Sequence, residues 1–226
     1  MKIENDGCTM KNILVVTGLI GVLASVLVGI GEYLLHYDSL ARFSEGGFGF
    51  MRGIDEHRTT GGHFIGVFGA TFYLIGCYHI YLMLRPAGER TAQVAFFVSA
   101  FGFIVGAVWI GSRASISALM QLPTAPEITQ LIDLYDLRYE TLLSVVRLTT
   151  LVLSVLFVVL TLSGRSRYPR WMAIFNPFVL ILASFATYLI APQVGKHLMP
   201  IALNVAFFLF FLLSLFYARD NHKIRG

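Results

Sequence analysis

The sequence predicts an all-α integral membrane protein, a bundle of six transmembrane helices with both termini in the cytoplasm. Of its 226 residues, 56% are hydrophobic and only 13% are charged, whereas a soluble domain carries about 25% charged residues. The mean hydropathy is +0.72. The apolar residues are gathered in long runs, and basic residues flank these runs. The length suits one compact bundle, so we expect a single transmembrane domain over 1–226.

The first three apolar runs are each long enough to cross a hydrocarbon core about 30 Å thick. The first covers about 12–37 and is too long for the core of a signal peptide. A polar, glycine-rich loop follows, and the second run covers about 62–84, stopping at Arg85-Pro86. The third run covers about 91–120. We therefore expect three membrane spans in this half of the chain.

The second half begins with an amphipathic stretch over 127–138, which we expect to lie on the membrane surface as a helix. The dipeptide Asn176-Pro177 interrupts a later apolar run and is a candidate for an internal kink. Three further spans are expected, over about 139–163, 171–191 and 197–217.

The orientation follows from the distribution of lysine and arginine. With a cytoplasmic N-terminus, ten of the seventeen basic residues fall on the inner side and five on the outer side, with Arg113 and Arg147 inside the membrane. Cytoplasmic segments carry an excess of these residues. The same count gives no reason to expect nucleic-acid binding.

Pairs of glycines four residues apart lie in the second and third runs, at Gly62/Gly66 and Gly102/Gly106. Small residues at this spacing let membrane helices approach closely. We interpret these pairs as packing signals.

Ionisable residues within the apolar runs point to a working site. Glu32 and His36 are four residues apart, so both lie on one face of the first helix. Arg113 and Arg147 fall at a similar depth, in the outer third of the bilayer. Charged groups at such depth are costly and usually functional. Further polar residues that we expect to face the same pocket are Glu140, Ser144 and Asn204.

Three interpretations of this cluster stay open. Two arginines against one deep glutamate leave a positive surplus, which favours an anionic guest such as a carboxylate, a phosphate or a lipid headgroup. The charges also fit a purely structural ion pair. A third interpretation is acid–base catalysis on a lipid-like substrate, with Glu32, His36 and His63 as catalytic residues.

A metal site is a weaker alternative. Residues on the outer side offer suitable ligand types, but no tight ligand motif joins them. The residues in question are His36, Asp38, Asp55, Glu56, His57 and His63. We therefore predict no metal and no other cofactor.

The segment Gly31-Glu32-Tyr33-Leu34-Leu35 resembles the end of the first span in the DUF6796 family, uncharacterised bacterial six-helix membrane proteins. The Asn176-Pro177 span, the turn over 192–200 and the Asn204-bearing last helix resemble the same family. The chain carries Glu32 where aspartate is expected. The resemblance implies the six-helix architecture and assigns no activity.

These observations predict a multi-pass protein of the bacterial inner membrane with an outward-facing polar pocket. We expect it to bind or transport a small anionic or amphiphilic molecule, with membrane lipids as its surroundings. Against transport, the sequence shows no internal repeat and no clearly broken pair of helices, features of many transporters. The alternatives are an intramembrane enzyme and a structural or accessory membrane protein.

Overall fold

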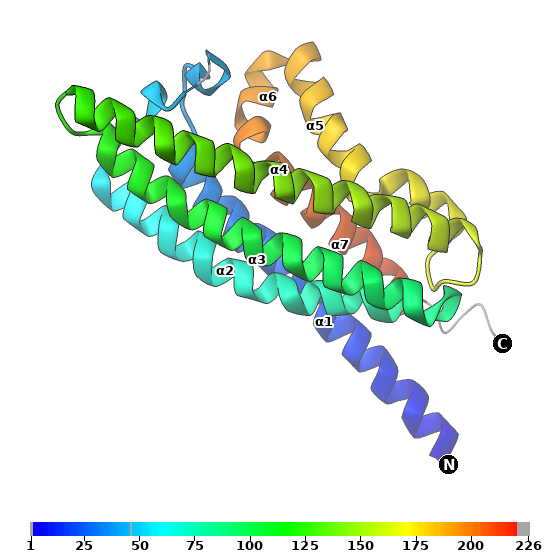
Figure 1. Ribbon diagram of the computed structural model, residues 1–226. Coiled ribbons are helices and arrows are strands. Elements are labelled where there is room, and N and C mark those ends of the chain that lie inside the picture. Colours follow the sequence, from blue (N-terminus) through cyan, green and yellow to red (C-terminus); the bar gives the residue numbers. More distant parts are fainter. Residues whose placement is uncertain (1, 46, 221–226) are drawn as a thin grey trace.

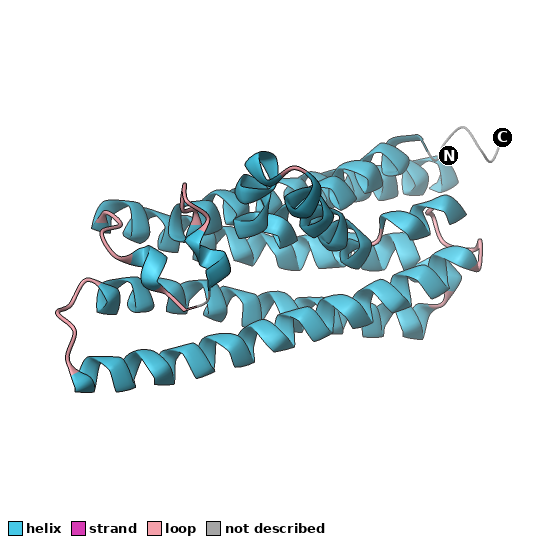
Figure 2. Ribbon diagram, turned by 90° about the horizontal axis from the view of Figure 1, so that it is seen from above, coloured by secondary structure: helices cyan, strands magenta, loops and turns pink. Residues whose placement is uncertain are grey.

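The computed structural model describes residues 2–45 and 47–220, and in this part of the chain it contains helices and no strands (Figures 1 and 2). The α-helices are α1 (Lys2–His36), α2 (Glu56–Leu84), α3 (Glu89–Met120), α4 (Pro126–Leu162), α5 (Pro177–Ile190), α6 (Pro192–Leu198) and α7 (Ala202–Asp220). Short 3-10 helices connect them: η1 (Arg42–Glu45), η2 (Gly49–Met51), η3 (Arg85–Ala87), η4 (Arg170–Phe175) and η5 (Met199–Ile201). The all-helical prediction is confirmed.

Among the described residues, five helices are long and apolar enough to cross a membrane. They are α1, α2, α3, α4 and the nearly continuous segment from α6 through η5 to α7. The predicted number of six spans is therefore not confirmed. The helix α5 is apolar but has only 14 residues, which at about 1.5 Å per residue falls short of a core about 30 Å thick.

The long helices lie side by side in one bundle, and α1 begins at the same end of the bundle at which α7 finishes (Figures 1 and 2). We call this end the termini end. The opposite end, where α1 finishes and the loop residues 37–45 and 47–55 lie, is the lid end.

Glycines bring the backbones of α1 and α2 into contact. A Cβ atom at Gly62 would lie 2.9 Å from the carbonyl oxygen of Gly31. A Cβ atom at Gly102 would collide with the side chain of Thr149 on α4. The predicted packing role is confirmed for Gly62 of the first pair and Gly102 of the second, because only a residue without a side chain allows such close approach.

The predicted surface helix over 127–138 and the span over 139–163 form one helix, α4, of 37 residues. Pro126 occupies its first turn, where a missing N–H group costs nothing. Leucines and isoleucines between the carboxylates continue the apolar face of the span, so the structure shows no boundary at residue 138.

The predicted span over 171–191 is divided at Asn176 into η4 and α5. Asn176 adopts an extended conformation, which a residue before proline favours. Its side chain accepts a hydrogen bond from the N–H of Val179, at 3.1 Å, and Ser154 of α4 accepts one from Phe178, also at 3.1 Å. The kink candidate is thus a complete break between η4 and α5.

The helices α5 and α6 form a tight hairpin that stands away from α4 toward the lid end (Figure 1). The connection is short, and a Cβ atom at Gly195 would collide with the backbone of Tyr188. The space between this hairpin and α4 positions the candidate site.

Candidate functional site

An ion pair between α1 and α3 forms the centre of the site. Arg113 Nη2 donates a hydrogen bond of 2.9 Å to Glu32 Oε1. Asn204 of α7 donates from Nδ2 to Glu32 Oε2 at 2.5 Å. The three side chains are buried, and Arg113 is only 2% exposed. The structure therefore brings together three predicted site residues from three helices.

Aromatic residues that the sequence analysis did not identify complete this cluster. The Tyr73 hydroxyl donates to Asn204 Oδ1 at 2.8 Å, and Arg113 Nη2 lies 3.4 Å from the hydroxyl of Tyr139. The Arg113 guanidinium carbon lies 3.7 Å from the centre of the Trp109 ring, a favourable cation–π geometry. Trp109 precedes Arg113 by four residues on one helix face, a signal that the sequence contained.

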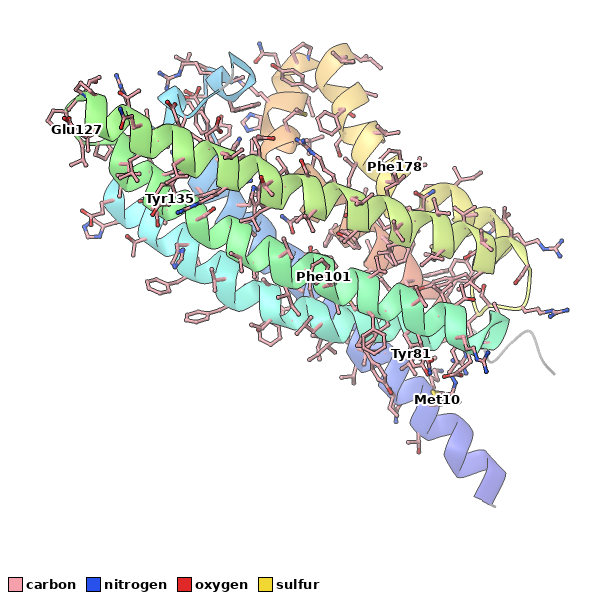
Figure 3. The ribbon with its side chains drawn as sticks, viewed as in Figure 1. Met10, Tyr81, Phe101, Glu127, Tyr135 and Phe178 are labelled. Carbon is pink, nitrogen blue, oxygen red and sulfur yellow. The ribbon has the colours of Figure 1, made fainter. Side chains whose placement is uncertain are left out.

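A cavity of about 460 Å³ lies over the cluster, between α4 and the α5–α6 hairpin. Its size is typical of a site for a small molecule. Phe178, at the start of α5, lines it from the hairpin side (labelled in Figure 3). The residues that line the cavity include Glu32, His36, Phe43, Phe48, Phe50, Trp109, Arg113, Asp136, Tyr139, Glu140, Arg147, Phe178, Ile181, Leu182, Phe185 and Leu203.

Several buried polar atoms in the lining of this cavity have no hydrogen-bond partner among the described residues. They are Nε and Nη1 of Arg113, Nε1 of Trp109 and Nδ1 of His36. A buried donor left unpaired costs about 1–3 kcal/mol. Native structures pair almost all such groups with protein atoms or with ordered water. The cavity is therefore suited to a guest that accepts hydrogen bonds.

Arg147 and Glu140 lie where the cavity meets the surface. Their side chains are 64% and 53% exposed, and Arg147 Nη1 lies 3.8 Å from Glu140 Oε2. Asp136 also lines the cavity. Three carboxylates, those of Glu32, Asp136 and Glu140, thus face two arginines in the lining. The positive surplus expected from the sequence was wrong, and the attraction for an anion rests on the unpaired nitrogens of Arg113 at the floor.

Three predicted site residues, Ser144, His63 and Asn204, do not line the cavity. Ser144 is exposed on α4. His63 lies on α2 beside α3, where its ring is 3.6 Å from the place of a Cβ atom on Gly111. A smaller space of about 30 Å³ lies behind Glu32 and is lined by Asn204 and Tyr73.

The loop at the lid end closes the cavity from that side with Phe43, Phe48 and Phe50. Phe48 packs edge-to-face on Tyr139, with ring centres 5.1 Å apart, and Phe50 lies 4.8 Å from the His36 ring. We call this loop the lid.

The lid is anchored by polar contacts. The Asp38 carboxylate accepts hydrogen bonds from the Arg42 side chain and backbone, and these bonds hold its pKa below the ordinary value. Arg58 donates to the carbonyl oxygens of Leu34 and Tyr37, at 2.7 and 2.5 Å. The Gln121 side chain joins Met51 and Gly53 of the lid to α3.

The residues considered as metal ligands have other contacts or lie apart. Asp55 caps the start of α2 by accepting from the His57 N–H, and Asp38 pairs with Arg42. Among the described residues, no three or more His, Cys, Asp or Glu side chains are grouped to hold a metal ion.

The profile of a family of unknown function, DUF6796, matches residues 10–221. The chain belongs to the DUF6796 family. No curated protein and no solved structure matches it significantly. The function of the DUF6796 family is unknown, so the cavity is the feature of this chain that bears on its function.

Proposed function

We propose that this protein binds a small anionic or amphiphilic molecule in the cavity between α4 and the α5–α6 hairpin. The main support is that Arg113 is buried in the cavity lining and that two of its nitrogens, Nε and Nη1, have no hydrogen-bond partner among the described residues. A carboxylate or phosphate supplies the acceptor oxygens that these nitrogens lack.

Each residue of the cluster has a distinct role in this proposal. Arg113 holds the acidic headgroup, and Trp109 supports the guanidinium and donates from its indole N–H. Glu32 fixes Arg113, and Asn204 in turn holds Glu32. Because both Glu32 oxygens already accept hydrogen bonds, Glu32 acts as a positioning residue.

The proposed membrane setting is the bacterial inner membrane, with six crossings and both termini in the cytoplasm. The excess of lysine and arginine on the termini side supports this orientation. An even number of crossings also suits helices α1 and α7, which start and finish at one end of the bundle (Figure 1). The short α5 would make its crossing together with η4.

The test is native mass spectrometry and lipid extraction of the gently solubilised protein. The informative variant is Glu32→Gln/Arg113→Gln, which removes both charges and leaves no buried ion unpaired. We expect a co-purifying acidic amphiphile in the wild type and its loss in this double variant. The control Arg85→Gln removes an exposed arginine at the termini end and should retain the molecule.

An empty wild-type protein with an unchanged fold in the double variant would contradict the proposal. It would favour the alternative that the ion pair only stabilises the bundle. Turnover of a bound lipid that depends on His36 would instead favour the enzyme alternative, now without His63, which lies outside the cavity.

A further inference from the structure

The exposure of the residues around the cavity shows where it opens. At the floor, Glu32, Trp109 and Arg113 are buried, and so are Phe48 and Phe50 of the lid. On α5, Leu182 and Phe185 are 50% and 42% exposed although they line the same cavity. Arg147 faces them from α4 with 64% exposure. The opening therefore lies on the flank of the bundle, between α4 and α5.

In a membrane, this flank faces lipid. The neighbouring surface of α4 carries exposed Leu148, Leu151 and Val155, and the rest of α5 exposes Leu189 and Ile190. Such side chains are typical of a surface in contact with acyl chains. A molecule that enters through this opening comes from the bilayer.

On the side of the lid, the described residues cover the cavity. The lid contributes apolar rings that pack on Tyr139 and His36, and Gln121, Arg58 and Asp38 hold its backbone in place. Entry from water would require these contacts to break together, whereas the flank stands open in the structure.

The walls of the cavity differ between its two ends. The unpaired N–H groups lie at the floor, and Phe178, Ile181 and Leu203 make an apolar wall leading toward the opening. The carboxylates Asp136 and Glu140 line the α4 side, and Arg147 lies beside Glu140 at the opening. The unpaired groups of the floor fit one acidic head, and the apolar wall fits a chain directed outward, whereas Asp136 and Glu140 disfavour an acidic group anywhere but at the floor.

We propose that the ligand is an anionic membrane lipid, which enters the cavity sideways from the bilayer through the opening between α4 and α5. This inference rests on the proposed binding function and adds the class of ligand and its route. The headgroup passes Arg147 and ends on Arg113, while the chain stays against α5 or in the bilayer.

Trp109 offers a direct readout, because the chain has only two tryptophans and Trp171 lies outside the lining. The Trp171→Phe protein is reconstituted in phosphatidylcholine vesicles, and its emission is measured as phosphatidylglycerol brominated near the headgroup is added to the bilayer. The comparison quenchers are phosphatidylcholine brominated at the same position and aqueous iodide.

We expect brominated phosphatidylglycerol to quench Trp109 and to saturate at a low mole fraction, and unbrominated phosphatidylglycerol to restore the emission. Brominated phosphatidylcholine should quench less, and iodide should not quench. In a Phe50→Ala protein, which opens the lid, iodide quenching should appear.

Quenching of the parent protein by iodide, with no effect of brominated lipids, would overturn the lateral route while leaving an anion site intact. Equal quenching by both brominated lipids would overturn the anionic ligand class. If the preference for phosphatidylglycerol survives in Glu32→Gln/Arg113→Gln, then the proposed role of Arg113 fails although lateral entry stands.

Discussion

At the scale of single residues, Arg113 is the side chain on which both the fold and the proposed site depend. Its guanidinium is buried and charged. It contacts the Glu32 carboxylate, the more distant Tyr139 hydroxyl and the Trp109 ring. Two of its nitrogens stay unpaired. Such incomplete pairing suits a group that also serves a ligand better than one that serves the bundle alone.

Replacing Arg113 alone should therefore destabilise the protein. In Arg113→Ala the Glu32 carboxylate stays buried without its counter-charge, and we expect a loss of about 3–5 kcal/mol in unfolding free energy. Thermal or SDS-induced unfolding in detergent measures this loss. The double variant Glu32→Gln/Arg113→Gln should recover most of it, and equal destabilisation of both variants would contradict the ion-pair explanation.

Asp38 gives the lid a dependence on pH. Its pKa is lowered in the folded protein by hydrogen bonds from Arg42. The contribution of the carboxylate to stability is complete above the pKa of the unfolded state and is lost as the pH falls through the lower, folded-state pKa. We expect the lid to stay closed at neutral pH and to become a pepsin target only in strong acid.

The variant Asp38→Asn mimics the protonated state, so its lid should be cleaved faster than that of the wild type already at mild pH. Asp133→Asn on α4 is the matched control. Identical cleavage of all three proteins at every pH would show that Asp38 does not hold the lid.

At the scale of elements, the contact between α1 and α2 depends on the absence of side chains. A methyl group at Gly62 would lie 2.9 Å from both the Gly31 carbonyl oxygen and the Leu34 Cβ. We expect Gly62→Ala to cost about 1–3 kcal/mol through overpacking, measured as a lower unfolding temperature in detergent.

The neighbouring Gly61 is a control within the same helix, because a Cβ atom there meets nothing within 4 Å. Gly61→Ala should leave stability unchanged or raise it by up to about 1 kcal/mol through helix propensity. A similar loss in both variants would point to backbone conformation and not to helix contact.

At the scale of the whole molecule, the proposed topology can be read by labelling introduced cysteines. In a Cys8→Ser background the remaining Cys77 is buried. We expect Ser39→Cys in the lid to react with an impermeant maleimide in intact cells. Ser163→Cys, at the termini end, should react only after the cells are permeabilised. The reverse pattern would invert the proposed orientation.

The sequence was sufficient for the helical class and for the common level of Glu32, Arg113 and Asn204 along the bundle. Long apolar runs can satisfy their backbone groups in a bilayer only as helices, and the position of Glu32, Arg113 and Asn204 within their runs placed them at one level. The glycine pairs likewise identified close helix contacts at Gly62, Gly66 and Gly102, whereas a Cβ atom at Gly106 would make only an ordinary contact of 3.8 Å.

The tertiary structure alone decided which of these residues share a cavity. Position along a helix fixes depth, but the rotation of each helix about its axis depends on its neighbours, so Ser144 and His63 turn away while Trp109 and Tyr139 face Arg113. The complete break at Asn176 also depends on the tertiary structure. The N–H of Phe178, in the first turn of α5, has no acceptor within its own helix, and the Ser154 hydroxyl of α4 supplies one. Because of that break α5 diverges from α4, and the divergence leaves the space that forms the cavity.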